Sequence, residues 1–353
     1  MSSLTVPHVK IVGLSACVPR RVEDNIDLPL WESADDARKV IESTGIERRR
    51  VVEPGTTASD LAVKAVTPLL NDLGWEKESI DLLVYVCASR DYISPQTACI
   101  LQARLGLSEG CLAFDLPMGC AGWVQGLASA SSLLSHGCLK RCLLINAETN
   151  TLNRSKKDKS VRPLFGDAAA VTALEYDPVG DNPFQFVFGV DGTGAEAVMA
   201  KYGGTRYPTT PESLQEKEYA PGIIRKGTDM VVNGMDVFSF AIRRPPQSLR
   251  ELISLYDIDI EKIDWLFLHQ ANRFIDEKIR RSLKVPAEKV PYSLDDFGNV
   301  SGVSIPLTMV TRCANALIEK DNHCLGCGFG VGLAWASVRF WVNRIVCVPL
   351  VEY

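Results

Sequence analysis

A repeated α/β unit is the feature of this sequence that most limits its fold. Segment 79–86 contains an isoleucine, an aspartate and then an apolar run, and segment 262–269 repeats this pattern. A helical pattern precedes each copy, one ending in Leu73 and the other containing Leu249, Leu252 and Leu255. Unbroken apolar runs of this length are typical of strands buried on both faces. The sequence therefore predicts an α/β protein with a mixed, mostly parallel sheet covered by helices.

The repeat continues beyond these strands. Cys120 follows Asp81 at nearly the same separation as Asn299 follows Asp264, and the glycine-containing segment 166–172 is echoed at 330–335. Two such units packed with pseudo-twofold symmetry would bring Cys120, His269 and Asn299 to one central site. We expect two halves, residues 1–180 and 181–353, divided at a stretch rich in proline and aspartate.

Composition narrows the class of protein. The chain has 353 residues, of which 46% are hydrophobic and 23% charged, and its net charge of −5 gives the whole molecule no attraction to nucleic acid or anionic membranes. We find neither a signal peptide nor an apolar run of about 18 residues, so no membrane span is expected. Eleven irregularly spaced cysteines indicate free thiols in a reducing compartment, and the expected location is the cytoplasm.

Apolar periodicity predicts most of the remaining elements. A turn is expected at 16–20, and the polar segment 199–230 is interpreted as an excursion over the surface. Thr57 to Asp60 forms a capping pattern for a helix. The expected strands are 9–14, 82–86, 111–114, 142–147, 265–268 and one beginning within 165–171; the expected helices are 34–43, 61–73, 97–105 and 123–134.

Cys120 is the first candidate for chemistry. A short apolar strand precedes it, small residues surround it, and a helix follows, so it is expected at a strand–helix turn. Free backbone N–H groups and the helix dipole at such a turn favour a thiolate over a thiol. The same turn would also suit a cysteine packed as a small apolar side chain.

His269 and Asn299 are the second and third candidates. His269 ends the apolar run 265–268, and Asn299 lies in a Gly-Asn-Val-Ser-Gly segment that opens another helix. A histidine at a strand end is also a common structural hydrogen-bonding group. The repeat, however, places both residues on the side of the sheet that carries Cys120.

These residues lie within motifs that resemble the β-ketoacyl-acyl-carrier-protein synthase III family, whose members are condensing enzymes with a thiolase fold. The matching motifs run in the family's order over residues 9–340. They are Asp115 with Gly119–Gly122, His269–Asn272, Gly298–Ser301 with Ile305 and Pro306, Thr44–Arg48, Pro95–Gly106, Phe165–Asp167, and Gly328–Gly330 with Trp335.

The resemblance implies a thiolase-like fold with two pseudo-symmetric βαβαβ halves in α-β-α-β-α layers. It implies an acyltransferase that carries out a decarboxylating Claisen condensation of an acyl thioester primer with malonyl-acyl-carrier protein in fatty acid biosynthesis. The implied partners are acyl carrier protein, an acyl primer on coenzyme A or carrier protein, and a second copy of the chain in a homodimer. Coenzyme A or phosphopantetheine thioesters would be substrates, with no further cofactor and no metal.

The resemblance also implies a role for each residue. Cys120 would attack the acyl thioester, and its own N–H with one from Gly330 or Val331 would form the oxyanion hole. His269 and Asn299 would donate hydrogen bonds to the malonyl thioester carbonyl and stabilise the enolate. Phe329 would form an apolar wall near the malonyl carboxylate, although it could equally be an ordinary core aromatic.

Several positions depart from the family pattern. Lys39 and Lys159 stand where members that use acetyl-CoA usually carry the Trp and Arg that hold adenine, so a coenzyme A primer is in doubt. Ser94 replaces an often bulky residue that reaches across the dimer, which predicts a longer or wider acyl tunnel. Arg273 lies one place before the family's carrier-protein-docking arginine, within a basic helix that is either a docking patch or a solvated face.

Other departures lie close to the expected nucleophile and in a helix. Met118 and Gly119 replace small alanines, and Val331 replaces a glycine in the oxyanion turn. Segment 243–246, Arg-Arg-Pro-Pro, interrupts or starts a helix.

Alternatives remain open. The chain could be a condensing enzyme of specialised metabolism that makes a ketide or joins two acyl chains, or a non-catalytic thiolase-fold subunit that binds a partner synthase. Cys324 and Cys327 are spaced as in some metal sites, but no second pair stands at zinc spacing. Glu148, just beyond an apolar strand, could face the site or form a salt bridge.

Overall fold

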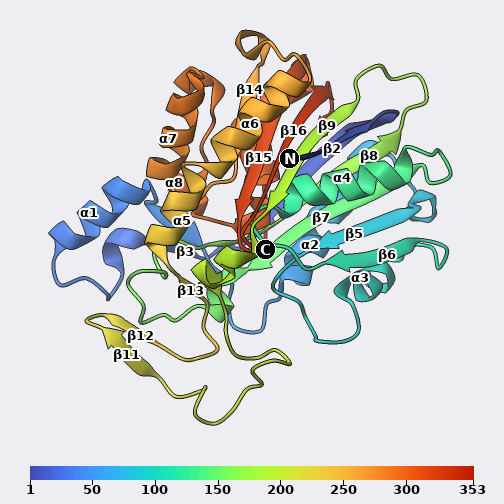
Figure 1. Ribbon diagram of the computed structural model, residues 1–353. Coiled ribbons are helices and arrows are strands. Elements are labelled where there is room, and N and C mark those ends of the chain that lie inside the picture. Colours follow the sequence, from blue (N-terminus) through green and yellow to red (C-terminus); the bar gives the residue numbers. More distant parts are fainter.

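The computed structural model describes residues 1–353 and contains two mixed β-sheets with helices between and around them (Figure 1). In the first sheet, the strand order is β17-β2-β8-β7-β5-β6, and β18 also pairs with β2. Its strands are β2 (Val9–Val18), β5 (Leu82–Val86), β6 (Leu112–Leu116), β7 (Arg141–Thr149), β8 (Asp167–Tyr176), β17 (Val346–Cys347) and β18 (Val351–Glu352). β5 is parallel to β6 and β7, whereas β8 is antiparallel to β7 and β2.

The second sheet repeats this pattern, with the order β1-β9-β16-β15-β14. Its strands are β1 (Ser2–Val6), β9 (Phe184–Val190), β14 (Trp265–Leu268), β15 (Asp321–Gly330) and β16 (Ala334–Asn343). β14 is parallel to β15, and β16 is antiparallel to β15 and β9, so β9-β16-β15-β14 corresponds to β2-β8-β7-β5.

The chain ends cross between the sheets. β1 belongs to the second sheet, while β17 and β18 pair with β2 in the first. The division into 1–180 and 181–353 stays a prediction, and these terminal strands do not follow it.

Helices complete the five layers. α4 (Gly122–Leu134) and α9 (Ser304–Arg312) contact strands of both sheets and lie between them. α2 (Ala58–Leu73) and α3 (Thr97–Leu105) cover the outer face of the first sheet; α6 (Arg244–Leu255) covers that of the second, with α5 (Gly234–Ala241) and α7 (Arg273–Leu283) beside it. The predicted layered fold is confirmed, but the expectation of mostly parallel strands is wrong for the second sheet, where only β14 and β15 are parallel. None of the helices is both long and apolar enough to cross a membrane.

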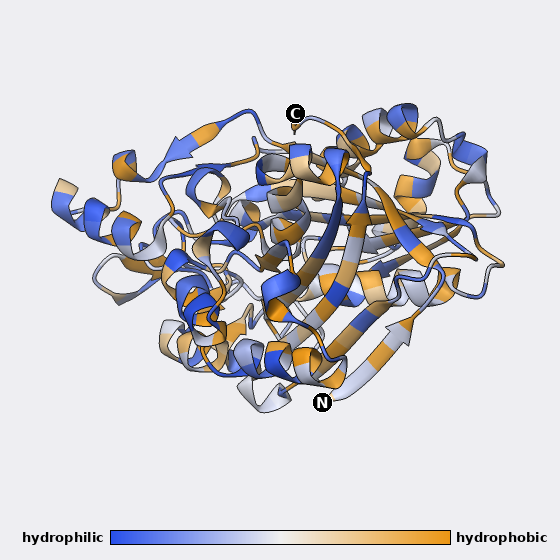
Figure 2. Ribbon diagram, turned by 90° about the horizontal axis from the view of Figure 1, so that it is seen from above, coloured by the Kyte–Doolittle hydropathy of each residue, from blue (hydrophilic) through white to orange (hydrophobic).

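Three apolar cores hold these layers together. One lies between the sheets and includes Trp123 and Phe267, one lies beneath α2 and α3, and one lies beneath α6 and α7. Seen from above, the outer helices alternate hydrophilic and hydrophobic residues, as expected for helices with one face on the core (Figure 2). On α7, Ile275, Ile279 and Leu283 are buried at a spacing of four residues, as expected for a helix with one face on the core.

Local signals explain several boundaries. The capping box predicted for α2 forms: the Thr57 N–H donates to the Asp60 carboxylate at 2.8 Å, and the helix begins at Ala58. Segment 243–246 starts a helix, since Pro245 lies in the first turn of α6, where its missing N–H has no helical partner to lose. The turn predicted at 16–20 is wrong in its first part, because β2 continues to Val18 through pairing with β8 and β18.

The segment 199–230 lies over the surface, as predicted. It carries the exposed hairpin of β11 (Lys217–Ala220) and β12 (Ile223–Arg225), which projects from the body in Figure 1. The remaining elements are α1 (Ala34–Thr44), α8 (Leu294–Phe297), α10 (Ala314–Glu319), β3 (Val22–Asp24), β4 (Arg48–Arg50), β10 (Val198–Met199) and β13 (Val231–Val232).

Candidate active site

Cys120 lies in the turn between β6 and α4, as the sequence predicts. β6 ends at Leu116 and α4 begins at Gly122, so the thiol is two residues from the first helical residue. Unlike Cys142 and Cys324, which are fully buried, Cys120 remains partly accessible. Its position combines a helix N-terminus with access for a reagent, which are the conditions for a reactive thiol.

The turn that joins β15 to β16 lies directly against this cysteine. A Cβ added to Gly330, whose φ is 156°, would lie 2.7 Å from the Cys120 sulfur, so only glycine fits there. The backbone N–H of Val331 is one of the groups that lower the pKa of the Cys120 thiol. The second half of the chain therefore supplies a main-chain donor to the cysteine of the first half.

His269 follows β14 and is 2% exposed. Its Nδ1 lies 3.1 Å from the carbonyl oxygen of Ser301. A carbonyl can only accept, so Nδ1 carries the hydrogen and Nε2 is the nitrogen that exchanges a proton with other groups. Phe329 packs edge-on against the imidazole, with ring centroids 5.3 Å apart.

Asn299 and Ser301 connect the other groups. The Asn299 Oδ1 accepts a hydrogen bond from the Ser301 N–H at 2.8 Å, which fixes the amide and leaves its Nδ2 as a donor. The Ser301 hydroxyl lies 3.6 Å from the Cys120 sulfur. Sequence reasoning missed Ser301, although its place two residues after Asn299 in the same glycine-bounded turn was a usable signal.

These contacts lower the pKa of Cys120. Burial alone would raise it, but the charge and hydrogen bond of His269, the Ser301 hydroxyl and the Val331 N–H outweigh burial and lower the pKa to about 6. The balance differs from the sequence expectation, which gave the helix N-terminus the leading role over a close Cys–His pair. At neutral pH the group is a thiolate, the nucleophilic form.

The comparisons with known proteins agree with this geometry. A family model described as 3-oxoacyl-[acyl-carrier-protein (ACP)] synthase III matches residues 114–192, and one described as its C-terminal part matches 254–341. A β-ketoacyl-[acyl-carrier-protein] synthase III of Caldanaerobacter subterraneus is 32% identical over 327 residues, covering 93% of this chain and 96% of its own. The chain belongs to the β-ketoacyl-[acyl-carrier-protein] synthase III family.

Solved structures support the same assignment. A 3-oxoacyl-(acyl-carrier protein) synthase from Burkholderia xenovorans is 33% identical, with a TM-score of 0.93 over 100% of this chain and 99% of that chain. The synthase III of Pseudomonas aeruginosa is 27% identical, with a TM-score of 0.82 over 97% and 100% of the two chains. The thiolase-like fold and the class of acyltransferase resembling synthase III are therefore confirmed.

Glu148 of this synthase is buried at the end of β7 near the site. Its carboxylate accepts hydrogen bonds from the Ala88 N–H at 2.9 Å and the Ser89 hydroxyl at 2.6 Å. Burial raises the pKa of Glu148 to about 7, while these donors and the charge of Arg154 oppose the rise. Glu148 thus holds residues 88–89 in place through two hydrogen bonds, and it forms no salt bridge.

Two predicted substrate-binding residues lie outside this cluster. Ser94 is on an exposed loop, beside Tyr92 and Ile93, whose side chains are 61% and 88% exposed. The Arg273 guanidinium lies over the Tyr292 ring, 3.9 Å from its centroid, at the start of α7. Neither residue contacts Cys120 within one copy of the chain.

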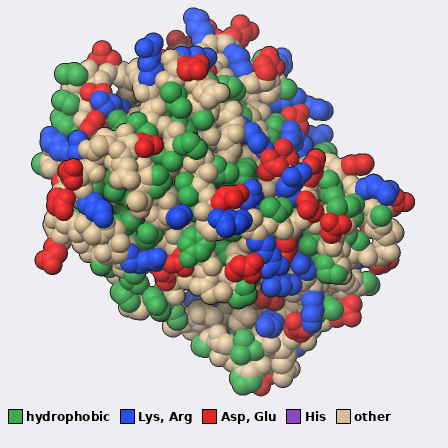
Figure 3. All heavy atoms as spheres, turned by 180° about the vertical axis from the view of Figure 1, so that it is seen from behind, with side chains coloured by type: hydrophobic (Ala, Val, Ile, Leu, Met, Phe, Trp, Pro, Cys, Tyr) green, Lys and Arg blue, Asp and Glu red, His purple; other side chains and the backbone are tan.

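Several positive charges of α7 are paired with neighbouring side chains of the same helix. Arg280 and Arg281 both bind Glu277, at 2.7 and 3.2 Å, and Lys278 lies over the Phe274 ring. Elsewhere too, basic and acidic side chains stand next to one another, as the view from behind shows (Figure 3). The positive charges of α7 are therefore partly neutralised by neighbouring acidic side chains, and the helix presents no extended positive surface to a partner.

Cys324 and Cys327 lie on opposite faces of β15. Cys324 packs in the core between the sheets, and Cys327 packs in the core beneath α6 and α7. The two thiols therefore do not face a common ligand, and no cluster of three His, Cys, Asp or Glu side chains is placed to hold a metal ion.

Proposed function

We propose that this enzyme condenses an acyl thioester primer with malonyl-acyl-carrier protein, with loss of CO2, to give a β-ketoacyl-acyl-carrier protein for fatty acid biosynthesis. The observation that carries the proposal is a partly accessible thiol at a helix start, 3.6 Å from the Ser301 hydroxyl, whose pKa is lowered to about 6 by His269, Ser301 and the Val331 N–H. The family assignment agrees with this chemistry.

The first half-reaction is acyl transfer. The Cys120 sulfur attacks the carbonyl carbon of the primer, the oxygen becomes an oxyanion between the N–H groups of Cys120 and the 330–331 turn, and the bond to the donor sulfur breaks. The proton that Cys120 gave up leaves with the donor thiol. His269 Nε2 is the proton carrier, since its Nδ1 is held by the Ser301 carbonyl.

The second half-reaction is decarboxylation and carbon–carbon bond formation. The malonyl carboxylate leaves as CO2, its electron pair forms an enolate, and that enolate attacks acyl-Cys120, releasing the cysteine thiolate. Asn299 Nδ2 and the protonated Nε2 of His269 donate hydrogen bonds to the enolate oxygen. His269 takes up one proton from solvent, which replaces the proton that left with the donor thiol, and the sulfur returns to the thiolate form. The Phe329 ring, edge-on to His269, keeps the malonyl carboxylate poorly solvated.

We also propose that the working unit is a homodimer that binds acyl carrier protein. β6 is the last strand of the first sheet, pairs only with β5, and leads directly to Cys120. Pairing of two β6 edges would extend the sheet. It would also cover the exposed Tyr92 and Ile93 and bring Ser94 of one copy towards the acyl site of the other.

Intact-protein mass spectrometry tests the proposal. The enzyme is incubated with butyryl-CoA and, separately, butyryl-acyl-carrier protein, and then with malonyl-acyl-carrier protein. We expect a butyryl adduct that maps to Cys120 and disappears as β-ketohexanoyl-acyl-carrier protein and CO2 form. Cys99→Ser serves as the control, because Cys99 is an exposed thiol on α3. Absence of any Cys120 adduct from either donor would overturn the proposal.

A further inference from the structure

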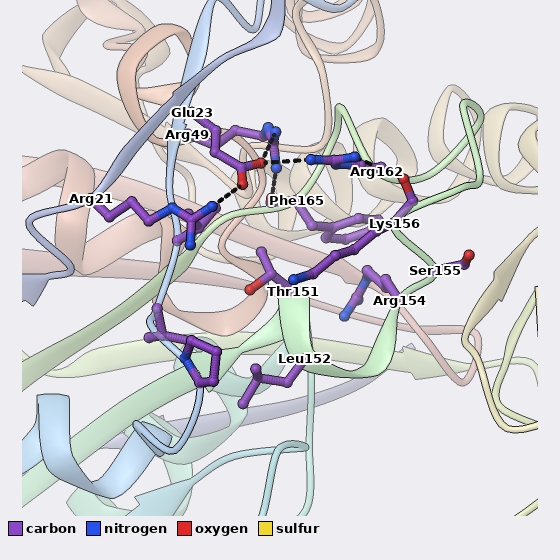
Figure 4. A pocket seen from close by; sticks show the side chains of 13 residues that line it. Arg21, Glu23, Arg49, Thr151, Leu152, Arg154, Ser155, Lys156, Arg162 and Phe165 are labelled. Carbon is purple, nitrogen blue, oxygen red and sulfur yellow. Dashed lines mark hydrogen bonds and ion pairs between the residues drawn. The ribbon is translucent and has the colours of Figure 1, made fainter. Parts of the chain in front are cut away.

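A cationic cavity lies beside the active site. It has a volume of about 300 Å³ and is formed by segments 21–23 and 49–54 together with the loop 151–165 (Figure 4). Its walls combine apolar side chains with positive charge. The charged residues that line it are Arg21, Glu23, Arg49, Arg154, Lys156 and Arg162.

Glu23 neutralises only one side of this cavity. Its carboxylate binds Arg21 and Arg49, each at 3.0 Å, and lies 3.5 Å from Arg162. Figure 4 shows these three contacts and shows no ion pair reaching Arg154 or Lys156. The single carboxylate of the cavity is thus shared by three guanidinium groups, and two cations are left without a carboxylate partner.

Arg154 is held rigidly but is incompletely satisfied. Its Nη1 donates to the Asn150 carbonyl at 2.7 Å and to the Asn153 side chain at 2.6 Å, and its guanidinium stacks 3.7 Å from the Phe165 ring centroid. Its Nε is shielded from water and has no hydrogen-bond partner. An unpaired donor on a desolvated cation is costly, and an anion supplied by a ligand would satisfy it.

Arg154 keeps its positive charge although it is buried. Burial lowers the pKa of Arg154 to about 10, with Glu148 and Cys120 opposing the fall, so the group is cationic at neutral pH. Glu148 is itself occupied by hydrogen bonds from Ala88 and Ser89. Asp167, the other carboxylate that acts on Arg154, accepts hydrogen bonds from the Val52 N–H and from Thr151. Neither carboxylate forms an ion pair with Arg154.

The cavity and the active site share a wall. Phe165, under the Arg154 guanidinium, forms a β-bridge with Asn299, and the Gly166 N–H donates to the Asn299 carbonyl at 3.1 Å. The charge of Arg154 also acts on Cys120. The cavity is therefore adjacent to the active site through Phe165, which lines one and pairs with Asn299 of the other.

We propose that this cavity binds a carboxylate at the far end of the acyl primer, so that the preferred substrate is an ω-carboxyacyl thioester. Arg154 and Lys156 bind the carboxylate, while Leu152, Val52 and Phe165 contact the methylene groups. This inference rests on the proposed function, because it concerns the acyl group that Cys120 accepts.

The test compares primers of equal carbon number that differ in one terminal group. Acylation of Cys120 by adipoyl-CoA is measured against hexanoyl-CoA, and glutaryl-CoA against valeryl-CoA, in the wild type and in Arg154→Gln, Arg154→Lys and Lys156→Gln. Lys157→Gln is the matched control, since Lys157 is the next residue and binds Glu216 at 2.6 Å outside the cavity.

We expect the wild type to prefer the carboxylated primers. Arg154→Gln should lower the ratio of kcat/KM for adipoyl-CoA to that for hexanoyl-CoA by about 10- to 100-fold, the range for a lost charged hydrogen bond. The ratio cancels the effect of the Arg154 charge on Cys120, which acts on both primers equally. Lys156→Gln should have a smaller effect in the same direction, Arg154→Lys should retain part of the activity, and Lys157→Gln should have none. Circular dichroism of Arg154→Gln separates loss of binding from loss of fold.

Two results would overturn the inference. Equal acylation by adipoyl and hexanoyl groups, unaffected by Arg154→Gln, would leave the proposed function intact and remove the carboxylate site. Calorimetry that detects inorganic phosphate but not adipate, again lost in Arg154→Gln, would assign the cavity to a phosphate. Failure of all four primers to label Cys120 would instead refute the proposed function, and the inference with it.

Discussion

The two halves of this synthase share one strand order and differ in the turn that opens the central helix. In the first half, the turn before α4 carries Cys120; in the second, the turn before α9 carries Asn299 and Ser301. The backbone framework is common, but one turn carries the proposed nucleophile and the other carries the proposed hydrogen-bond donors. The comparison teaches that a duplicated unit can divide a two-step reaction, because pseudo-symmetry brings both turns to one place.

The largest expected effect comes from separating the two half-reactions. Cys120→Ala should abolish the acyl adduct, whereas Asn299→Ala should still form it and lose about 100- to 1,000-fold in condensation rate, the usual effect of removing one oxyanion donor. Adduct mass and CO2 release measure the two steps independently. Asn343→Ala, an exposed asparagine on β16, is the control. Equal loss of acylation in Asn299→Ala would show that the halves do not divide the chemistry.

An intermediate effect should appear in the pH dependence of Cys120 alkylation by iodoacetamide. Because the folded pKa is lowered to about 6, the thiolate is present above that pH and is lost below it, so the rate should rise through about pH 6 and then level off. Ser301→Ala removes a donor from the second half and should move this midpoint up by about half a unit to one unit.

Peptide mapping assigns the alkylation to Cys120. Ser43→Ala on α1 is the control, because its hydroxyl bonds only to the Val40 carbonyl. A midpoint that stays near 6 in Ser301→Ala would mean that the second half does not stabilise the thiolate through this residue.

The smallest expected effect is on the free energy of unfolding, and it concerns the first residues of α2 and α6. These two helices cover the outer faces of the first and second sheets. α2 of the first half has a capping box, whereas α6 of the second starts at prolines without a side-chain cap. Thr57→Ala should therefore lower the free energy of unfolding by about 1 kcal/mol, and Arg243→Ala should change it by less than about 0.5 kcal/mol. Urea unfolding followed by circular dichroism measures both. Similar losses would show that the caps are equivalent after all.

Sequence patterns predicted the elements whose signals are local. Segment 82–86 is a strand with the expected ends, because apolar residues bury both of its faces, and α2 follows from the cap at Thr57. β2 was predicted too short, since its last residues are extended only because they pair with Ala169 and Val351. Pairing partners so distant in sequence leave no local pattern.

The same limit applies to the candidate site. Cys120 and His269 could be located because a strand end and a helix start frame them. The position of Ser301 beside Asn299 indicates that it lies near the site, but its contact with the Cys120 sulfur could not be predicted, because it joins turns from different halves. The cavity could not be predicted either, because only the fold shows that Glu23 lies near Arg162 and forms no ion pair with Arg154.

The crossing of the chain ends has a consequence for dissection of the molecule. A fragment that ends at residue 180 would contain β1 without its pairing partner β9. It would also contain β2 without β17 and β18, which pair with its edge. Each fragment would therefore expose a strand edge with unpaired backbone N–H and C=O groups. Each sheet contains at least one edge strand from the other end of the chain. We expect the two units to unfold in one cooperative transition, and neither should fold as an isolated fragment.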